Sequence, residues 1–121
     1  MKLATIGSRE LKYNTNFGEK TVRNFLLRYM EKYKDKITKV ISGGAIGTDQ
    51  IAEEVANRFK LSIEIIRPVN PQLKNHYLYR NIEIITKADK IIAFWNGVSR
   101  GTKFVIDYAK ARNKNILIVK V

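Results

Sequence analysis

The clearest fold signal in this chain is residues 39–49, which read Lys39-Val40-Ile41-Ser42-Gly43-Gly44-Ala45-Ile46-Gly47-Thr48-Asp49. Its first four residues read as a buried strand, which runs directly into a pair of glycines. An amphipathic helix follows, and its apolar residues recur at the spacing of one helix face: Ala52, Val55, Ala56 and Phe59. A strand, a glycine-rich turn and a helix together predict one βα unit of an α/β protein.

The same alternation of strand and helix extends from this unit to both ends of the chain. The predicted strands are residues 3–7, 39–42, 61–66, 90–95 and 115–119, and the predicted helices are 17–33, 48–59, 77–87 and 101–112. The last helix is expected to bury an apolar face made of Phe104, Val105, Tyr108 and Ala109.

The strands predict the type of sheet. They read as continuous apolar runs, which is typical of strands covered on both faces and favours a mainly parallel sheet. The chain of 121 residues is therefore predicted to be α/β, with a single compact Rossmann-like domain over residues 1–121, a five-stranded sheet and helices on both faces. In such sheets ligands bind beyond the carboxyl ends of the strands, near the point where the strand order reverses.

Composition limits the partners and cofactors. At 45% hydrophobic and 28% charged residues, the chain resembles soluble globular proteins. No apolar run approaches the roughly 20 residues of a membrane-spanning helix. The chain has no cysteine, and His76 is its single histidine. We therefore expect a cytoplasmic protein with no membrane partner, no metal site and no cofactor.

The charge is strongly positive and evenly spread. The 23 basic residues exceed the 11 acidic ones by 12, with 12 against 7 in residues 1–60 and 11 against 4 in residues 61–121. Such a surface attracts anions, either nucleotides or a nucleic acid backbone. A lysine-rich composition bias accounts for the charge equally well, so net charge alone does not choose between partners.

Two loops of small polar residues have the composition of anion-binding sites. Gly43, Gly44 and Gly47 precede the second helix, and a second loop contains Ser99-x-Gly101-Thr102. Glycine lets the backbone approach a ligand closely, and a helix N-terminus attracts a phosphate. The alternative is that the glycines only make tight turns and that the polar side chains cap helices. Neither loop is a P-loop or a Gly-x-Gly-x-x-Gly dinucleotide fingerprint.

A series of short motifs occurs in the order seen in the SLOG superfamily: Gly7-Ser8-Arg9, Ser42-Gly43-Gly44-Ala45 with Gly47-Thr48-Asp49, Arg80-Asn81, Ala88-Asp89, Phe94-Trp95 and Ser99-x-Gly101-Thr102. From residue 3 to residue 119 the chain resembles this superfamily, and most closely its small YspA/YpsA-related branch. The resemblance implies a Rossmann-like domain that binds nucleotides or nucleotide-derived ligands. More distantly, the chain is similar to the lonely-guy phosphoribohydrolases, which release a base from a nucleoside monophosphate, and to DNA-processing protein A, which binds single-stranded DNA.

One departure from these relatives bears on catalysis. The phosphoribohydrolases carry Pro-Gly-Gly-x-Gly-Thr-x-x-Glu, whose glutamate belongs to their catalytic centre. Aligning on Gly101-Thr102 puts Val105 at the position of that glutamate, and aligning on Gly47-Thr48 puts Ile51 there. We therefore lean against an enzyme and assign no catalytic residue. The acids that remain available for catalysis are Glu10, Asp49 and Asp107.

The residues expected to contact the ligand lie after the strands and at the start of the helices. They are Gly7, Ser8, Arg9, Ser42, Gly43, Gly44, Ala45, Gly47, Thr48, Asp49, Arg80, Asn81, Trp95, Ser99, Gly101 and Thr102.

Several of these side chains have a specific expected role. Arg9 and Arg80 are expected to bind phosphate through charge-assisted hydrogen bonds, and Asn81 to bind a base or ribose. Asp49 either accepts from a ribose hydroxyl or stabilises its own helix N-terminus. Trp95 either stacks on a base or packs in the core.

The leading hypothesis is a nucleotide-binding protein that acts as a sensor, a sequestering module or the partner of an enzyme. A phosphoribohydrolase-type hydrolase and a single-stranded nucleic acid binding protein are the alternatives. Self-association into a homo-oligomer is left open.

Overall fold

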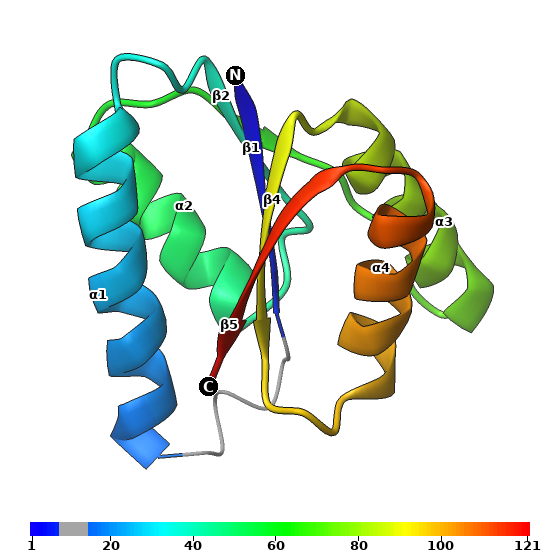
Figure 1. Ribbon diagram of the computed structural model, residues 1–121. Coiled ribbons are helices and arrows are strands. Elements are labelled where there is room, and N and C mark those ends of the chain that lie inside the picture. The colour runs from blue at the N-terminus through cyan, green and yellow to red at the C-terminus, as the bar shows by residue number, and fades with distance from the viewer. Residues whose placement is uncertain (8–14) are drawn as a thin grey trace.

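The computed structural model describes residues 1–7 and 15–121, and of residues 15–17 it describes only the backbone. Strands and helices alternate along the described residues (Figure 1). The elements are β1 (Lys2–Gly7), α1 (Thr15–Tyr33), β2 (Lys39–Ser42), α2 (Thr48–Arg58), β3 (Ile63–Ile65), α3 (Lys74–Lys87), β4 (Lys90–Trp95), α4 (Arg100–Ala111) and β5 (Asn115–Lys120).

The strands form one parallel sheet in the order β3-β2-β1-β4-β5. From β1 the chain first builds outward through β2 to β3, and it then crosses back to add β4 and β5 on the other side of β1. The strand order therefore reverses between β1 and β4. The predicted α/β class, with a Rossmann-like sheet covered by helices on both faces, is confirmed.

Two apolar layers hold the helices to the sheet. Figure 1 shows α1 and α2 on one face and α3 and α4 on the other. Successive side chains of β1 point to opposite faces of the sheet and so belong to different layers. Leu3 packs with side chains of α1 and α2, and Ala4 packs with side chains of α3 and α4. Phe94 lies fully buried in the first layer, where its ring meets Phe25 edge to face at 5.7 Å between centroids.

Two predictions about burial are wrong. Phe104 is 40% exposed, because the buried side of α4 is centred on Val105, Ile106 and Ala109, and its ring stacks on Tyr108 at 5.9 Å instead. The edge strands β3 and β5 are not covered on both faces: Ile65 of β3 is 41% exposed, and Leu117 and Ile118 of β5 are 36% and 38% exposed. Smaller differences are that α3 begins at Lys74 and that β3 spans only Ile63–Ile65.

Within the described part of the chain, each helix is too short or too polar to cross a lipid bilayer.

Candidate functional site

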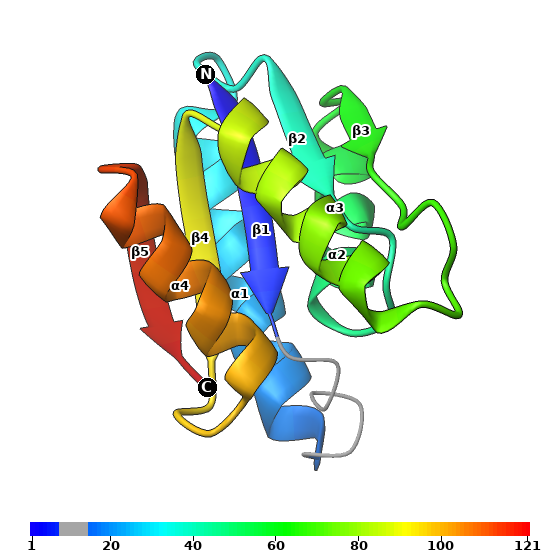
Figure 2. The ribbon, with the colours of Figure 1, turned by 90° about the vertical axis from the view of Figure 1, so that its right-hand side faces the viewer.

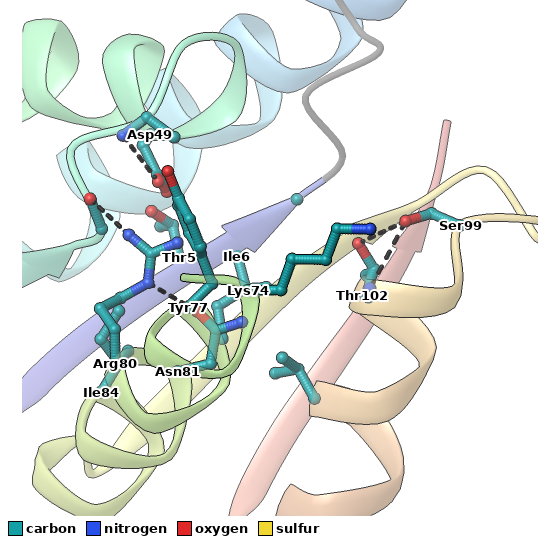
Figure 3. Close-up of a pocket in the computed structure, with 15 residues that line it drawn as sticks. Thr5, Ile6, Asp49, Lys74, Tyr77, Arg80, Asn81, Ile84, Ser99 and Thr102 are labelled. Carbon is teal, nitrogen blue, oxygen red and sulfur yellow. Dashed lines mark hydrogen bonds between the residues drawn. The ribbon is translucent and has the colours of Figure 1, made fainter. Parts of the chain in front are cut away.

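A cavity of about 470 Å³ lies at the carboxyl edge of the sheet, where the strand order reverses. Figure 2 shows that the strands point toward the edge at which α2, α3 and α4 begin. Figure 3 shows the side chains that surround the cavity. The lining residues are Thr5, Ile6, Gly7, Gly43, Ala45, Asp49, Lys74, Tyr77, Arg80, Asn81, Ile84, Ser99, Gly101, Thr102 and Val105.

Two glycines allow the backbone to pack closely at one end of this cavity. A Cβ atom on Gly7 would lie 2.1 Å from the Oγ1 atom of Thr48, so only glycine lets the end of β1 meet the first turn of α2. A Cβ atom on Gly43 would lie 2.6 Å from Nη1 of Arg80 and 2.9 Å from Oδ2 of Asp49. The β2–α2 loop therefore lies directly against the polar side chains that line the cavity.

Arg80 fixes the position of this loop from α3. Its Nη1 atom donates to the carbonyl oxygen of Gly43 at 2.6 Å, and its Nε atom donates to Oδ1 of Asn81 at 2.8 Å. The guanidinium also lies over the Tyr77 ring, 5.4 Å from its centroid, and the residue is only 8% exposed. Because several contacts hold Arg80, it brings a positive charge to the cavity wall in a fixed position.

Asp49, in the first turn of α2, is the acid of the cavity wall. Burial, together with the nearby charge of Glu53, raises the pKa of its carboxyl to about 6. Hydrogen bonds from the N–H groups of Ala45 and Gly43 and the charge of Arg80 act in the opposite direction; the bond from Ala45 to Oδ2 measures 3.2 Å. A carboxyl with such a pKa can give up or take a proton near neutral pH.

The N-terminus of α4 forms the opposite wall. Ser99 is its N-cap, and the Oγ atom accepts from the N–H of Thr102 at 3.4 Å. A Cβ atom on Gly101 would meet no atom within 4 Å, so the backbone there is open to the cavity. The amine of Lys74 extends across the cavity toward Ser99 and Thr102 (Figure 3). A helix N-terminus, an accessible backbone and an ammonium group are together suited to bind an anion.

The β4–α4 loop is held in shape by side chains behind the cavity. Oδ1 of Asn96 accepts from the N–H groups of Val98 and Ser99, each at 2.8 Å. The indole N–H of Trp95 donates to the carbonyl oxygen of Ser99 at 3.0 Å. Trp95 is not among the residues that line the cavity, so its contact in this structure is with the loop.

The structure brings most of the predicted site residues together and separates others. Those in the cavity wall are Gly7, Gly43, Ala45, Asp49, Arg80, Asn81, Ser99, Gly101 and Thr102, whereas Ser42, Gly44, Gly47, Thr48 and Trp95 lie outside it. Ser8 and Arg9 lie outside the described residues, as does the candidate acid Glu10. That any of these residues contacts a ligand stays a prediction.

Three of the predicted residues outside the wall, Ser42, Gly44 and Gly47, shape the β2–α2 loop. The Ser42 hydroxyl donates to Glu53 at 2.7 Å and accepts from the N–H of Gly44 at 3.1 Å. Gly47, with φ of 85°, is the N-cap of α2, and Gly44 has φ of 70°. Both angles lie in the left-handed region that favours glycine.

Lys74 and Tyr77 line the cavity but are not among the residues expected from the sequence to contact the ligand. The apolar periodicity predicts that the third helix starts at Tyr77, three residues after α3 begins at Lys74, so Lys74 falls in a predicted loop. Lys74 lies between Leu73 and Asn75, so the sequence around it carries no specific signal for a ligand-binding lysine.

The third candidate acid, Asp107, lies away from the cavity lining and pairs with Lys103 at 2.8 Å on the exposed side of α4. Among the described residues no three or more histidine, aspartate or glutamate side chains gather as metal ligands would.

Known structures with the same fold include two DNA-processing proteins. DNA processing protein A (DprA) from Streptococcus pneumoniae matches with a TM-score of 0.79 and 18% identity, over 97% of this chain and 49% of that one. The Helicobacter pylori protein, described by its single-stranded DNA binding mode, matches with a TM-score of 0.74 and 21% identity, over 98% of this chain and 64% of that one. The chain thus spans half to two thirds of their length.

A third structure, TM1055, matches with a TM-score of 0.71 and 20% identity, over 95% of this chain and 71% of that one. Neither a family model nor a curated protein sequence matches the chain. At this level of identity the likeness concerns the fold, which is that of a Rossmann-like α/β domain.

Proposed function

We propose that the protein binds a nucleotide or a nucleotide-derived ligand, with the phosphate in the cavity between the N-termini of α2 and α4. The observation that carries this proposal is the open backbone at Gly101, which faces the cavity beside the Ser99 cap and the Lys74 amine. Phosphate is the common biological anion that needs such a combination of N–H donors and a cation.

The remaining wall suits the rest of a nucleotide. Asp49 and Asn81 offer groups that hydrogen-bond to ribose hydroxyls, and Ile84 and Val105 supply an apolar floor. The similarity of the sequence motifs to the SLOG superfamily supports the same ligand class, and membership of the YspA/YpsA-related branch is part of this proposal. We propose a binding role, as a sensor, sequestering module or partner of an enzyme, because the residue that aligns with the phosphoribohydrolase glutamate is Val105 or Ile51, and neither is an acid.

Lys74→Ala tests the proposal by calorimetric titration with nucleoside monophosphates. The Lys74 side chain is exposed, and it makes no hydrogen bond to another helix or strand of the described residues. The variant should therefore fold normally. We expect its affinity to fall roughly 10-fold, as for loss of a charge-assisted hydrogen bond of about 1.5 kcal/mol. Lys110→Ala removes the same charge from the last turn of α4, outside the cavity lining, and should leave affinity unchanged. Equal loss in both variants, or no binding by the unmodified protein, would contradict the proposal.

Single-stranded nucleic acid is the second candidate ligand. The net charge of +12 favours it, and a protein of the same fold is described by its single-stranded DNA binding mode. An oligonucleotide would place one phosphate in the cavity and extend over lysines outside it. Binding of an oligodeoxynucleotide much tighter than that of any mononucleotide, with Lys74→Ala and Lys110→Ala equally affected, would favour this candidate.

A further inference from the structure

A second cavity, of about 510 Å³, adjoins the first behind Tyr77. The two cavities share Gly43, Ala45, Tyr77 and Arg80 in their walls, so they are two lobes of one site with the stacked Tyr77 and Arg80 between them. We call the cavity at the α4 N-terminus the phosphate lobe and its neighbour the second lobe.

The second lobe has apolar walls and a planar cation. Ile46, Pro68 and Pro71 contribute apolar surface from the β2–α2 loop and the β3–α3 segment, and Ile46 is 50% exposed. Figure 2 shows the β3–α3 segment as the long loop that leads to the start of α3. Arg67 completes the wall, and its Nη1 atom donates to the carbonyl oxygen of Gly44 at 3.2 Å. Apolar walls beside a guanidinium group suit a flat ring with polar edges.

The polar groups of the second lobe are mainly donors. Its described lining contains two arginines and no carboxylate or amide side chain. The carbonyl oxygens of Gly43 and Gly44 already accept from Arg80 and Arg67. A guanidinium group has five N–H donors and no acceptor, and Arg67 uses one of them on Gly44 in this structure. The ring edge that fits here is therefore one with adjacent acceptors.

We propose that the second lobe is a base-binding subsite that prefers an oxo-purine, with Arg67 donating to the O6 and N7 acceptors of the base. Guanine presents these two acceptors side by side, whereas adenine presents an amino donor in place of O6. This inference rests on the proposed nucleotide function, because it needs the phosphate in the neighbouring lobe to place the base. The expected ligand is therefore a guanine or hypoxanthine nucleotide.

Titration calorimetry with GMP, AMP and ribose 5-phosphate separates the two lobes. We expect GMP to bind at least fivefold more tightly than AMP, and ribose 5-phosphate to bind more weakly than either. In Arg67→Ala the preference for GMP over AMP should disappear, while the affinity for ribose 5-phosphate stays unchanged. Arg67→Lys keeps the charge but loses the planar pair of donors, so it should lose the preference as well.

Arg28→Ala, on the exposed side of α1, is the matched control and should leave every affinity unchanged. Equal affinities for GMP and AMP would overturn the base subsite, as would an Arg67→Ala variant that weakens ribose 5-phosphate as much as GMP. If ribose 5-phosphate and both nucleotides fail to bind, the proposed function itself is wrong. If ribose 5-phosphate binds as tightly as GMP, the base contributes nothing to affinity. The phosphate lobe would then still be a binding site, but the second lobe would not bind the base.

Discussion

The carboxyl of Asp49 lines the phosphate lobe and also affects the folding stability of the protein. Its carboxyl has a pKa near 6 in the folded chain, against 3.8 for an ordinary aspartate. The folded state therefore binds this proton more tightly than the unfolded state does, and the stabilisation from Asp49 is complete below about pH 4. This stabilisation is lost as the pH rises through 6. The difference between a pKa of 3.8 and one of about 6 corresponds to about 3 kcal/mol of unfolding free energy.

We expect Asp49→Asn to remove this pH dependence. The free energy of unfolding of the unmodified protein should fall relative to that of the variant by about 3 kcal/mol between pH 4 and pH 7. Urea denaturation at four pH values across this range measures the difference. Parallel curves for Asp49→Asn would show that the carboxyl is not perturbed.

Gly43 and Gly101 both line the phosphate lobe, but the same methyl group should act on them in opposite ways. At Gly43 the new Cβ would collide with Arg80 and Asp49, so Gly43→Ala should lower stability by about 1–3 kcal/mol. At Gly101 it meets open space within helix α4, so Gly101→Ala should gain up to about 1 kcal/mol.

The Gly101 methyl group would nevertheless occupy the place where a ligand approaches the backbone. We therefore expect Gly101→Ala to be at least as stable as the unmodified protein and to bind nucleotide several-fold more weakly. Thermal unfolding and calorimetry on the same sample measure both quantities. Unchanged affinity would mean that the ligand does not approach the α4 N-terminus.

At the scale of elements, β1 and α2 are joined by a contact that tolerates no side chain. Gly7→Ala would place a Cβ atom 2.1 Å from Oγ1 of Thr48, so the first turn of α2 must move. We expect a loss of about 1–3 kcal/mol in unfolding free energy. Adding Thr48→Ala removes the Oγ1 and Cγ2 atoms and should restore part of that loss. If the changes in unfolding free energy caused by Gly7→Ala and Thr48→Ala are additive in the double variant, the two residues are not in steric contact.

The elements themselves could be predicted because apolar periodicity reports which side of a segment is buried. It does not report which neighbour covers that side, so the apolar runs of the edge strands β3 and β5 wrongly predict strands that are enclosed on both faces. The phosphate lobe was largely predictable, because glycine and hydroxyl residues directly follow the strands. Lys74 and the second lobe were not, because they depend on how the segment between β3 and α3 folds back against the β2–α2 loop.

At the scale of the whole molecule, the dispersed positive charge predicts how binding depends on salt. A single strand held by six lysines would lose affinity with a log–log slope near −4, using about −0.7 for each phosphate contact. A mononucleotide bound in the phosphate lobe carries few charges, and its slope should be much shallower. Titrations at salt concentrations from about 50 to about 300 mM measure both slopes. A steep slope for the mononucleotide would place the charged surface, and not the cavity, at the centre of binding.

The chain contains one tryptophan, Trp95, and its position makes it a built-in optical probe. The indole N–H is bonded to the carbonyl oxygen of Ser99, so the ring follows the loop that caps α4 while staying out of the phosphate lobe. Val121 donates its N–H to the carbonyl oxygen of Trp95 at 3.0 Å, which ties the same residue to the end of the chain. Ligand occupancy should therefore be readable from intrinsic fluorescence, without a label and without a reporter group competing for the site.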